Sequence, residues 1–298
     1  MSRDQNKASI GFVGTGVMGK SMAGHLLEAG HPMKVYNRTR SKAEDLIEKG
    51  AVWSETAGAA AVDVDVVISI VGFPADVEHC YFGNGGILEK ARSGACLIDM
   101  TTSSPALAGK IAEAADQRQL SALDAPVSGG DLGAREARLS IMVGGEIKVY
   151  ERMLPVFEVM GKNIVYQGPA GSGQHTKMAN QIAIAAGMIG VCESIAYARR
   201  SGLDPKTVLE SIGSGAAGSW SLNNLGPRIV SGDFAPGFYV KHFIKDMKIA
   251  LESADALGLE TPGLALAQDL YGRLSDGGGE DLGTQALYQL IEGKAIGG

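Results

Sequence analysis

The first half of the chain alternates short apolar runs with amphipathic stretches. The runs Ile10–Val13, Val64–Val71 and Ala95–Ile98, and the segment Met33–Tyr36 with one lysine, are each followed by polar turn residues, glycine or proline. Val64–Val71 is almost continuously apolar, which is typical of a parallel strand buried on both faces. Between the runs, apolar residues recur at helical spacing. The pattern predicts a parallel sheet whose strands are connected by helices.

This alternation continues to about residue 168. Strands are expected at Ser121–Leu123, Leu139–Val143 and Asn163–Tyr166, and helices at Pro105–Gln117 and Lys148–Met160. A Gly-Pro-Ala-Gly stretch at 168–171 then marks a domain boundary. We therefore expect an α/β domain over residues 1–168 and a second domain over residues 169–298.

A long helix is predicted from Gly171 to Arg200. No proline interrupts it, and no charged residue occurs from Ile182 to Cys192. A helix that is apolar all round is normally buried on every side, so we expect this one to lie between the two domains. The uncharged run is shorter than the about 20 apolar residues that span a bilayer.

The remainder of the chain has only helical patterns. Asp204 and Pro205 are typical of a helix start, and helices are also expected around Asp246–Leu257, Pro262–Ser275 and Asp281–Ile291. No strand alternation is present, so residues 169–298 are predicted to form an all-α domain.

Composition narrows the class of protein. The 298 residues are 45% hydrophobic and 20% charged, as in soluble globular proteins, and the net charge of -6 argues against a nucleic-acid or membrane partner. Cys80, Cys96 and Cys192 are expected to be buried, reduced thiols, and no Cys or His pair has metal-ligand spacing. The N-terminus lacks a hydrophobic segment, which predicts a cytoplasmic protein.

The first predicted strand is followed by a glycine-rich turn and a helix. In such a G-x-G-x-x-G turn the first glycine makes the tight turn, the second lets a pyrophosphate approach the backbone, and the third lets helix and strand pack closely. The N–H groups and dipole of the new helix face the phosphates. The pattern predicts a Rossmann-type dinucleotide-binding domain. The candidate residues are Gly14, Thr15, Gly16, Val17, Met18 and Gly19.

The second strand ends at Asn37, Arg38 and Thr39. A carboxylate at this position would bond the ribose hydroxyls of NAD and repel a 2′-phosphate, whereas Arg38 can pair with the phosphate. Asn37 and Thr39 can donate hydrogen bonds. NADP(H) is therefore expected in preference to NAD(H), which would bind more weakly. The alternative is that Arg38 is a solvated turn residue.

Ligands of open α/β sheets bind at the carboxyl ends of strands. Val71, Phe73, Thr101 and Thr102 follow predicted strands and are candidates to line the nicotinamide half of the pocket. Residues 101–104 could equally cap the next helix.

A rigid loop follows the strand at 121–123. Pro126 and two glycines leave backbone N–H groups available for a carboxylate, and Ser128 adds a hydroxyl donor. Ser128, Gly129 and Gly130 are therefore candidate substrate ligands, with an ordinary turn as the alternative.

Polar groups gather at the start of the long helix. Lys177 and Asn180 are three residues apart and share a face with Gln181, and Gly173 is expected to leave space over it. Lys177 could donate a proton, and Asn180 a hydrogen bond, to a small polar substrate. The alternative is a solvated first turn.

Four blocks in order resemble the β-hydroxyacid dehydrogenase family, which includes 3-hydroxyisobutyrate dehydrogenases and tartronate and succinic semialdehyde reductases. The resemblance covers essentially the whole chain. The blocks are GFVGTGVMG at 11–19, DAPVSGG at 124–130, GxxxKxxN at 173–180, and Lys245-Asp246 after Phe238.

The resemblance implies an enzyme that transfers hydride between NADP(H) and a small carboxylate substrate. Lys177 would be the catalytic lysine, Asn180 would orient the substrate, and Ser128–Gly130 would bind its carboxylate. Thr102 and Lys245 would contact the cofactor. A homodimer or homotetramer is also implied.

Some features depart from the family or leave alternatives. Arg138 and Lys241 add positive charge where many members have glycine or an acidic residue, which leaves the substrate open. A 6-phosphogluconate-type dehydrogenase is disfavoured because Gln181, not histidine, adjoins Asn180, and an imine reductase is disfavoured by Lys177. A catalytically silent NADP-binding sensor or interaction module remains the alternative function.

Overall fold

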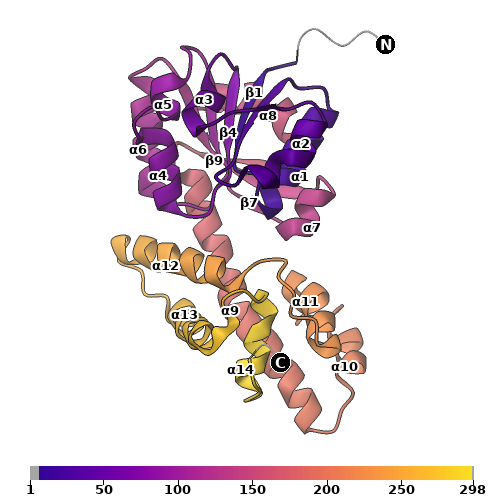
Figure 1. Cartoon of the computed structure of the whole chain (residues 1–298). Helices are drawn as coiled ribbons and strands as arrows, with labels where there is room; N and C mark the ends of the chain where they lie inside the picture. Colours follow the sequence, from indigo (N-terminus) through magenta and orange to yellow (C-terminus); the bar gives the residue numbers. More distant parts are fainter. Residues whose placement is uncertain (1–6, 297–298) are drawn as a thin grey trace. The chain divides into compact units, whose positions relative to one another are not determined.

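The computed structural model describes residues 7–296, which form two compact units that meet in sequence between Lys177 and Met178 (Figure 1). The N-terminal unit is built on a nine-stranded sheet in the order β3-β2-β1-β4-β5-β6-β8-β7, with β9 beside β8. Its strands are β1 (Ile10–Val13), β2 (Met33–Tyr36), β3 (Val52–Trp53), β4 (Val66–Ser69), β5 (Cys96–Asp99), β6 (Ser121–Asp124), β7 (Val127–Ser128), β8 (Leu139–Gly145) and β9 (Gly161–Gly168).

Helices cover both faces of this sheet (Figure 1). Val66 and Ile68 of β4 pack in a core with α1 and α8, whereas Val67 packs on the other face with α4 and α6. Because successive strand residues point to opposite faces, a strand buried on both must be apolar throughout. The helices are α1 (Val17–Glu28), α2 (Glu44–Glu48), α3 (Ala57–Ala61), α4 (Pro74–Phe82), α5 (Ile87–Lys90), α6 (Pro105–Asp116), α7 (Gly130–Arg135) and α8 (Ile147–Phe157).

The predicted Rossmann-type sheet is confirmed, with additions at one end. The strands β1 to β6 are parallel, but β8 runs antiparallel to β6 and to β7. The strands β3 and β7 and the helices α2, α3, α5 and α7 were not predicted, because these elements are too short to show a periodicity.

The C-terminal unit is helical, as expected. In its described residues, 178–296, the β-structure consists of one isolated bridge between Tyr239 and Gly283. Helix α11 (Trp220–Ser231) was not predicted, because it contains Gly226 and Pro227 and its start follows a small-residue loop. The helices are the continuation of α9 (Ser172–Arg200), then α10 (Pro205–Ile212), α11 (Trp220–Ser231), α12 (Val240–Ala256), α13 (Pro262–Leu274) and α14 (Leu287–Ile291).

The long helix α9 is less buried than its composition suggests. Met188 and Cys192 lie in the core of the helical unit, but the small residues Ala183, Gly187 and Gly190 are exposed. Burial on every side was therefore a wrong expectation. By length and composition α9 as a whole could cross a membrane, yet 44% of its most apolar window is buried inside the protein, as in core helices of globular proteins.

Candidate active site

The glycine turn after β1 is fixed by close backbone contacts. Gly14 has φ +101°, and a Cβ there would collide with the carbonyl of Ile70. A Cβ on Gly19 would collide with the carbonyl of Gly14, whereas one on Gly16 would meet nothing within 4 Å. Helix α1 then begins at Val17 with no side-chain cap and no acidic residue in its first turn. The N–H groups of this turn can therefore receive an anionic ligand.

Asn37 connects the end of β2 to the glycine turn. Its Oδ1 accepts a hydrogen bond from Thr15 N at 3.0 Å, and its Nδ2 donates to Thr39 O at 2.9 Å. These contacts hold the end of β2 beside the glycine turn. They use one of the two N–H donors of the amide that was expected to donate to the cofactor.

Arg38 has a partner that the sequence did not reveal. Its side chain is 83% exposed, and its Nη1 lies 3.2 Å from Oδ1 of Asp76. The other carboxylate oxygen of Asp76 accepts the Phe73 N–H at 3.1 Å, at the start of α4. Only one of the five guanidinium N–H groups faces Asp76 in this pair, so Arg38 keeps donors for a phosphate.

The ends of β4 and β5 carry a buried polar network. Val71 N donates to Thr101 Oγ1 at 3.0 Å, and Oδ1 of Asp99 accepts from Thr101 N at 3.1 Å and from Ser69 Oγ at 2.9 Å. Thr101 is 1% exposed, so it supports the rim rather than lining a pocket. Ser104 caps α6 by accepting from Leu107 N, as the alternative reading expected.

Asp99 is the most perturbed carboxyl group of this network. Burial raises the pKa of Asp99 from its usual 3.8 to about 6, against the opposing effect of its hydrogen bonds from Thr101 and Ser69. Its neighbour across the β5–β6 ladder is another buried carboxylate, Asp124, whose charge raises the pKa of Asp99 further.

The segment after β6, expected to be a rigid loop, contains the short strand β7 of the sheet. Ser128 belongs to β7 and pairs with Ser140 of β8, and α7 begins at Gly130. Gly129 and Gly130 have φ +130° and +63°, which L side chains adopt only with strain. Arg138 forms an ion pair with Glu136.

Lys177 lies one turn inside α9 and is 7% exposed, so the alternative of a solvated first turn is wrong. The start of α9 is attached to the sheet. Asp124 Oδ1 accepts from Gly171 N and its Oδ2 from Gln174 N, both at 2.8 Å. Gly173 does not leave open space: a Cβ there would collide with carbonyl oxygens of Met142 and Asp124.

The helical unit holds the other two candidates on its own network. Asn180 Nδ2 donates to Gln181 Oε1 at 2.8 Å, and Gln181 in turn donates to Asp246. Lys245 Nζ lies 2.8 Å from Asp246 Oδ1, and both side chains are largely buried. Lys241 pairs instead with Asp281 at the surface.

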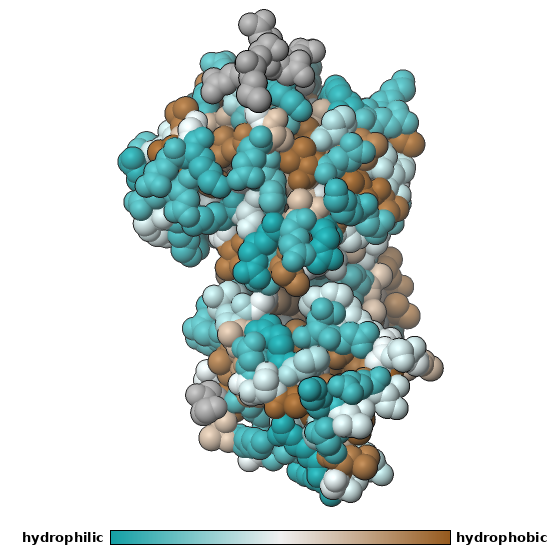
Figure 2. Space-filling model, turned by 90° about the vertical axis from the view of Figure 1, so that its right-hand side faces the viewer, coloured by the Kyte–Doolittle hydropathy of each residue, from teal (hydrophilic) through white to brown (hydrophobic). Residues whose placement is uncertain are grey.

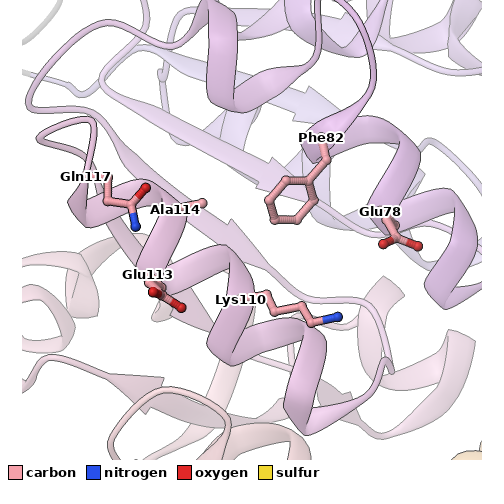
Figure 3. Close-up of a pocket in the computed structure, with 6 residues that line it drawn as sticks. All are labelled: Glu78, Phe82, Lys110, Glu113, Ala114 and Gln117. Carbon is pink, nitrogen blue, oxygen red and sulfur yellow. The ribbon is translucent and has the colours of Figure 1, made fainter.

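A pocket of the described residues lies away from these candidate residues. It has about 340 Å³ and opens between α4 and α6, where Glu78, Phe82, Lys110 and Glu113 line it with Ala114 and Gln117 (Figure 3). None of these residues belongs to the glycine turn or the start of α9. In the part of the chain that the structure covers, no group of three or more His, Cys, Asp or Glu residues could hold a metal. Cys80, Cys96 and Cys192 are free and buried, as expected.

Similarity to known proteins covers both units. Residues 9–168 match the family model described as the NAD-binding domain of 6-phosphogluconate dehydrogenase. Residues 171–291 match the model described as NAD-binding of NADP-dependent 3-hydroxyisobutyrate dehydrogenase.

Individual proteins extend this similarity. An uncharacterized oxidoreductase of Bacillus subtilis, YkwC, is 62% identical over 95% of this chain and 99% of its own. The 2-hydroxy-3-oxopropionate reductase of Escherichia coli is 39% identical over 95% of this chain and 97% of its own. The solved structure of Psf3 in complex with NADP+ and 2-OPP has a TM-score of 0.88 at 27% identity, and covers 95% of this chain and 99% of that one. The chain thus belongs to the β-hydroxyacid dehydrogenase family and is an NAD(P)-dependent oxidoreductase.

Proposed function

We propose that the protein reversibly transfers hydride between NADP(H) and a small β-hydroxyacid or its semialdehyde, with Lys177 as general acid and base. One observation carries the proposal. The start of α9, which bears Lys177, is bonded to Asp124 at the carboxyl end of β6. This is the same edge of the parallel sheet at which the glycine turn of β1 opens, so the lysine belongs to the edge where such sheets bind ligands.

Each candidate residue has a separate role in the proposed reaction. NADP(H), when bound, supplies or accepts the hydride. Lys177 hydrogen-bonds the carbonyl oxygen and donates a proton to it in reduction, which such acids accelerate by about 10²–10⁴-fold. Asn180 orients the lysine and the oxygen. Ser128–Gly130 hold the substrate carboxylate, and Thr102 and Lys245 contact the cofactor.

NADP(H) is the preferred cofactor in this proposal. The end of β2 offers an exposed guanidinium, Arg38, and Asn37 in place of the carboxylate of NAD-specific sheets. NADP+ is bound in the structure of Psf3, a protein similar to this one. NAD(H) would bind more weakly.

The substrate class follows from relatives as well as from the site. The E. coli relative is a 2-hydroxy-3-oxopropionate reductase, and another relative, from Pseudomonas aeruginosa, is a 3-hydroxyisobutyrate dehydrogenase. Both names describe a short acid with a hydroxyl or carbonyl near its carboxylate. We infer a substrate of this kind.

The decisive experiment replaces the lysine. Lys177→Ala should lose at least about 100-fold in turnover while it still binds NADPH. Lys110→Ala, in the distant pocket between α4 and α6, is the matched control and should behave like the wild type. Near-normal turnover of Lys177→Ala would exclude the proposed role.

A panel of candidate substrates would identify the substrate. NADPH and NADH oxidation would be measured with succinic, tartronic and methylmalonic semialdehydes. Turnover of at least one with NADPH is expected. Silence across the panel together with tight NADPH binding would instead favour a sensor or interaction module.

Self-association is the final part of the proposal. Figure 2 shows apolar residues between hydrophilic ones on one face of the protein. In the helical unit Tyr197 is 75% exposed and Leu257 70% exposed, and the small residues Ala183, Gly187 and Gly190 of α9 are exposed as well. Such apolar surface supports a homodimer or homotetramer. Sedimentation that gives only a monomer at micromolar concentration would contradict it. A cytoplasmic location stays a prediction.

A further inference from the structure

We propose that Gln174 is a positioning residue of the reaction: it fixes the Lys177 amine relative to the loop that contacts the nicotinamide. The inference rests on the proposed function, because it gives Gln174 a task only if Lys177 is the proton donor. Gln174 is not among the candidate site residues that the sequence suggested.

The side chain of Gln174 clamps the loop between β5 and α6. It is 0% exposed, and both ends of its amide are used. Nε2 donates to Thr101 O at 2.7 Å, and Oε1 accepts from Ser103 N at 2.9 Å. These two backbone groups lie on either side of Thr102. A single side chain therefore holds both flanks of the residue proposed to contact the cofactor.

The backbone of Gln174 is held just as firmly. Its N–H donates to Asp124 Oδ2 at 2.8 Å, and Asp124 Oδ1 accepts from Gly171 N. Gly173 and Gly144 permit this close packing, since a Cβ on either would collide with the sheet or the start of α9. The first turn of α9 thus has no freedom to slide along the strand ends.

Lys177 is carried on the same helical turn. Residues three apart lie on one side of a helix and differ in height by only about 4.5 Å. The backbone between residues 174 and 177 is regular helix, so a displacement of Gln174 is transmitted to Lys177. Through Gln174, the proton donor and Thr102 share one rigid support.

A general acid is sensitive to such support. Misplacement of a reacting group by about 1 Å can cost on the order of 100-fold in rate. A purely structural glutamine would lower the stability of the fold without changing the rate of the folded enzyme. The two roles therefore differ in a measurable way.

The test compares Gln174→Met with Gln285→Met. Gln285 is also buried, at 1% exposure, and its side chain also hydrogen-bonds two backbone groups, here the carbonyls of Asp233 and Ala235, but it lies in the helical unit. Both variants should lose thermal stability. Gln174→Met should also lose about 10- to 100-fold in kcat, with the Kd for NADPH changed by less than about five-fold. Gln285→Met should keep kcat within about two-fold.

The second arm places Gln174→Met in the Lys177→Ala background. If Gln174 acts through the lysine, its replacement should change the residual rate there by less than about three-fold. An equal loss in both backgrounds, or a Gln174→Met enzyme with wild-type kcat, would overturn the proposal. If Lys177→Ala itself is active, the proposed function fails instead.

A milder variant covers the case in which Gln174→Met does not fold. Gln174→Asn keeps the amide but is one methylene shorter, so it reaches only one of the two backbone groups. An intermediate loss in kcat is expected at temperatures where the variant is folded. A folded Gln174→Asn with wild-type kcat would also overturn the proposal.

Discussion

Two helices begin at the same edge of the sheet, and their first turns differ. Helix α1 starts after the glycine turn of β1 with no side-chain cap and no acidic residue. The start of α9 is already occupied, because the carboxylate of Asp124 accepts the N–H groups of Gly171 and Gln174. At both starts, backbone N–H groups that have no partner within the helix lie at the positive end of the helix dipole.

The difference separates a binding turn from an anchored turn. Where the donors of α1 stay open, an anionic ligand can take them. Where an internal carboxylate takes the donors of α9, the helix is fixed to the sheet and can carry a reactive side chain in a constant place. An anion at a helix N-terminus thus gives rigidity at α9, and the same arrangement at α1 is the proposed site for the cofactor phosphates.

Removing the internal anion should break the anchored turn. Asp124→Ala leaves two buried N–H groups without acceptors, which we expect to cost about 4 kcal/mol of unfolding free energy. Urea denaturation measures the loss. The control is Asp204→Ala, because Asp204 caps the exposed start of α10 in the same way and should lose less. Equal losses would contradict the anchoring role.

Asp99 is the contrasting carboxylate. It lies opposite Asp124 in the sheet, but Asp124 is the one that accepts hydrogen bonds from the N-terminus of α9. The folded pKa of Asp99, about 6, lies above the usual 3.8, so the stability it contributes is complete below about pH 3.8 and is lost as pH rises through about 6. Between pH 4 and 7 the wild type should lose up to about 3 kcal/mol more than Asp99→Asn. Parallel pH–stability curves for the two proteins would refute this.

A carboxylate introduced at the first turn of α1 should occupy its N–H groups, as Asp124 occupies those at the start of α9. A side chain at Gly16 meets nothing within 4 Å, so Gly16→Asp should fold with its carboxylate over the first turn of α1. We expect about 30-fold weaker NADPH binding by calorimetry, from competition with the pyrophosphate. Gly16→Ala adds bulk without charge and separates the two effects. Undiminished affinity in Gly16→Asp would show that the turn does not bind phosphate.

The smallest expected effect concerns the 2′-phosphate of the cofactor. Arg38→Leu should weaken NADPH by roughly 10-fold and leave NADH within about two-fold, because only NADPH offers a 2′-phosphate to the guanidinium. Asp76→Asn removes the carboxylate that faces Arg38 and should shift the preference further toward NADPH. Equal changes for both cofactors would remove Arg38 from cofactor choice.

Much of the fold was predictable from local pattern. The bounds of β1 and β2 agree with those predicted. β1 is buried at every position, and a strand buried on both faces has few polar residues to obscure its pattern. The antiparallel strands β7 and β8 were not recognised as such, because strand direction depends on the partner rather than on composition. The exposed side of α9 was missed because alanine and glycine are equally compatible with core and surface.

The site was predictable where the chemistry is local. Gly14, Gly16 and Gly19 lie on a single turn, so their roles can be predicted from spacing, and the close backbone contacts expected at Gly14 and Gly19 are present. Arg38 could be named as a phosphate partner, but its neighbour Asp76 could not, since the two lie 38 residues apart.

The sequence by itself determined the glycine turn, the missing carboxylate after β2, the order of the two units and the lysine at the entrance of a long helix. Each of these depends on covalent spacing and on the periods of strand and helix. Only the tertiary structure decided what holds that helix. Asp124 reaches residues 47 and 50 positions away, and Gln174 reaches back 71 and 73 positions. Hydrogen bonds between buried groups so far apart leave no periodic trace in the chain, because they depend on which strand ends the fold brings together.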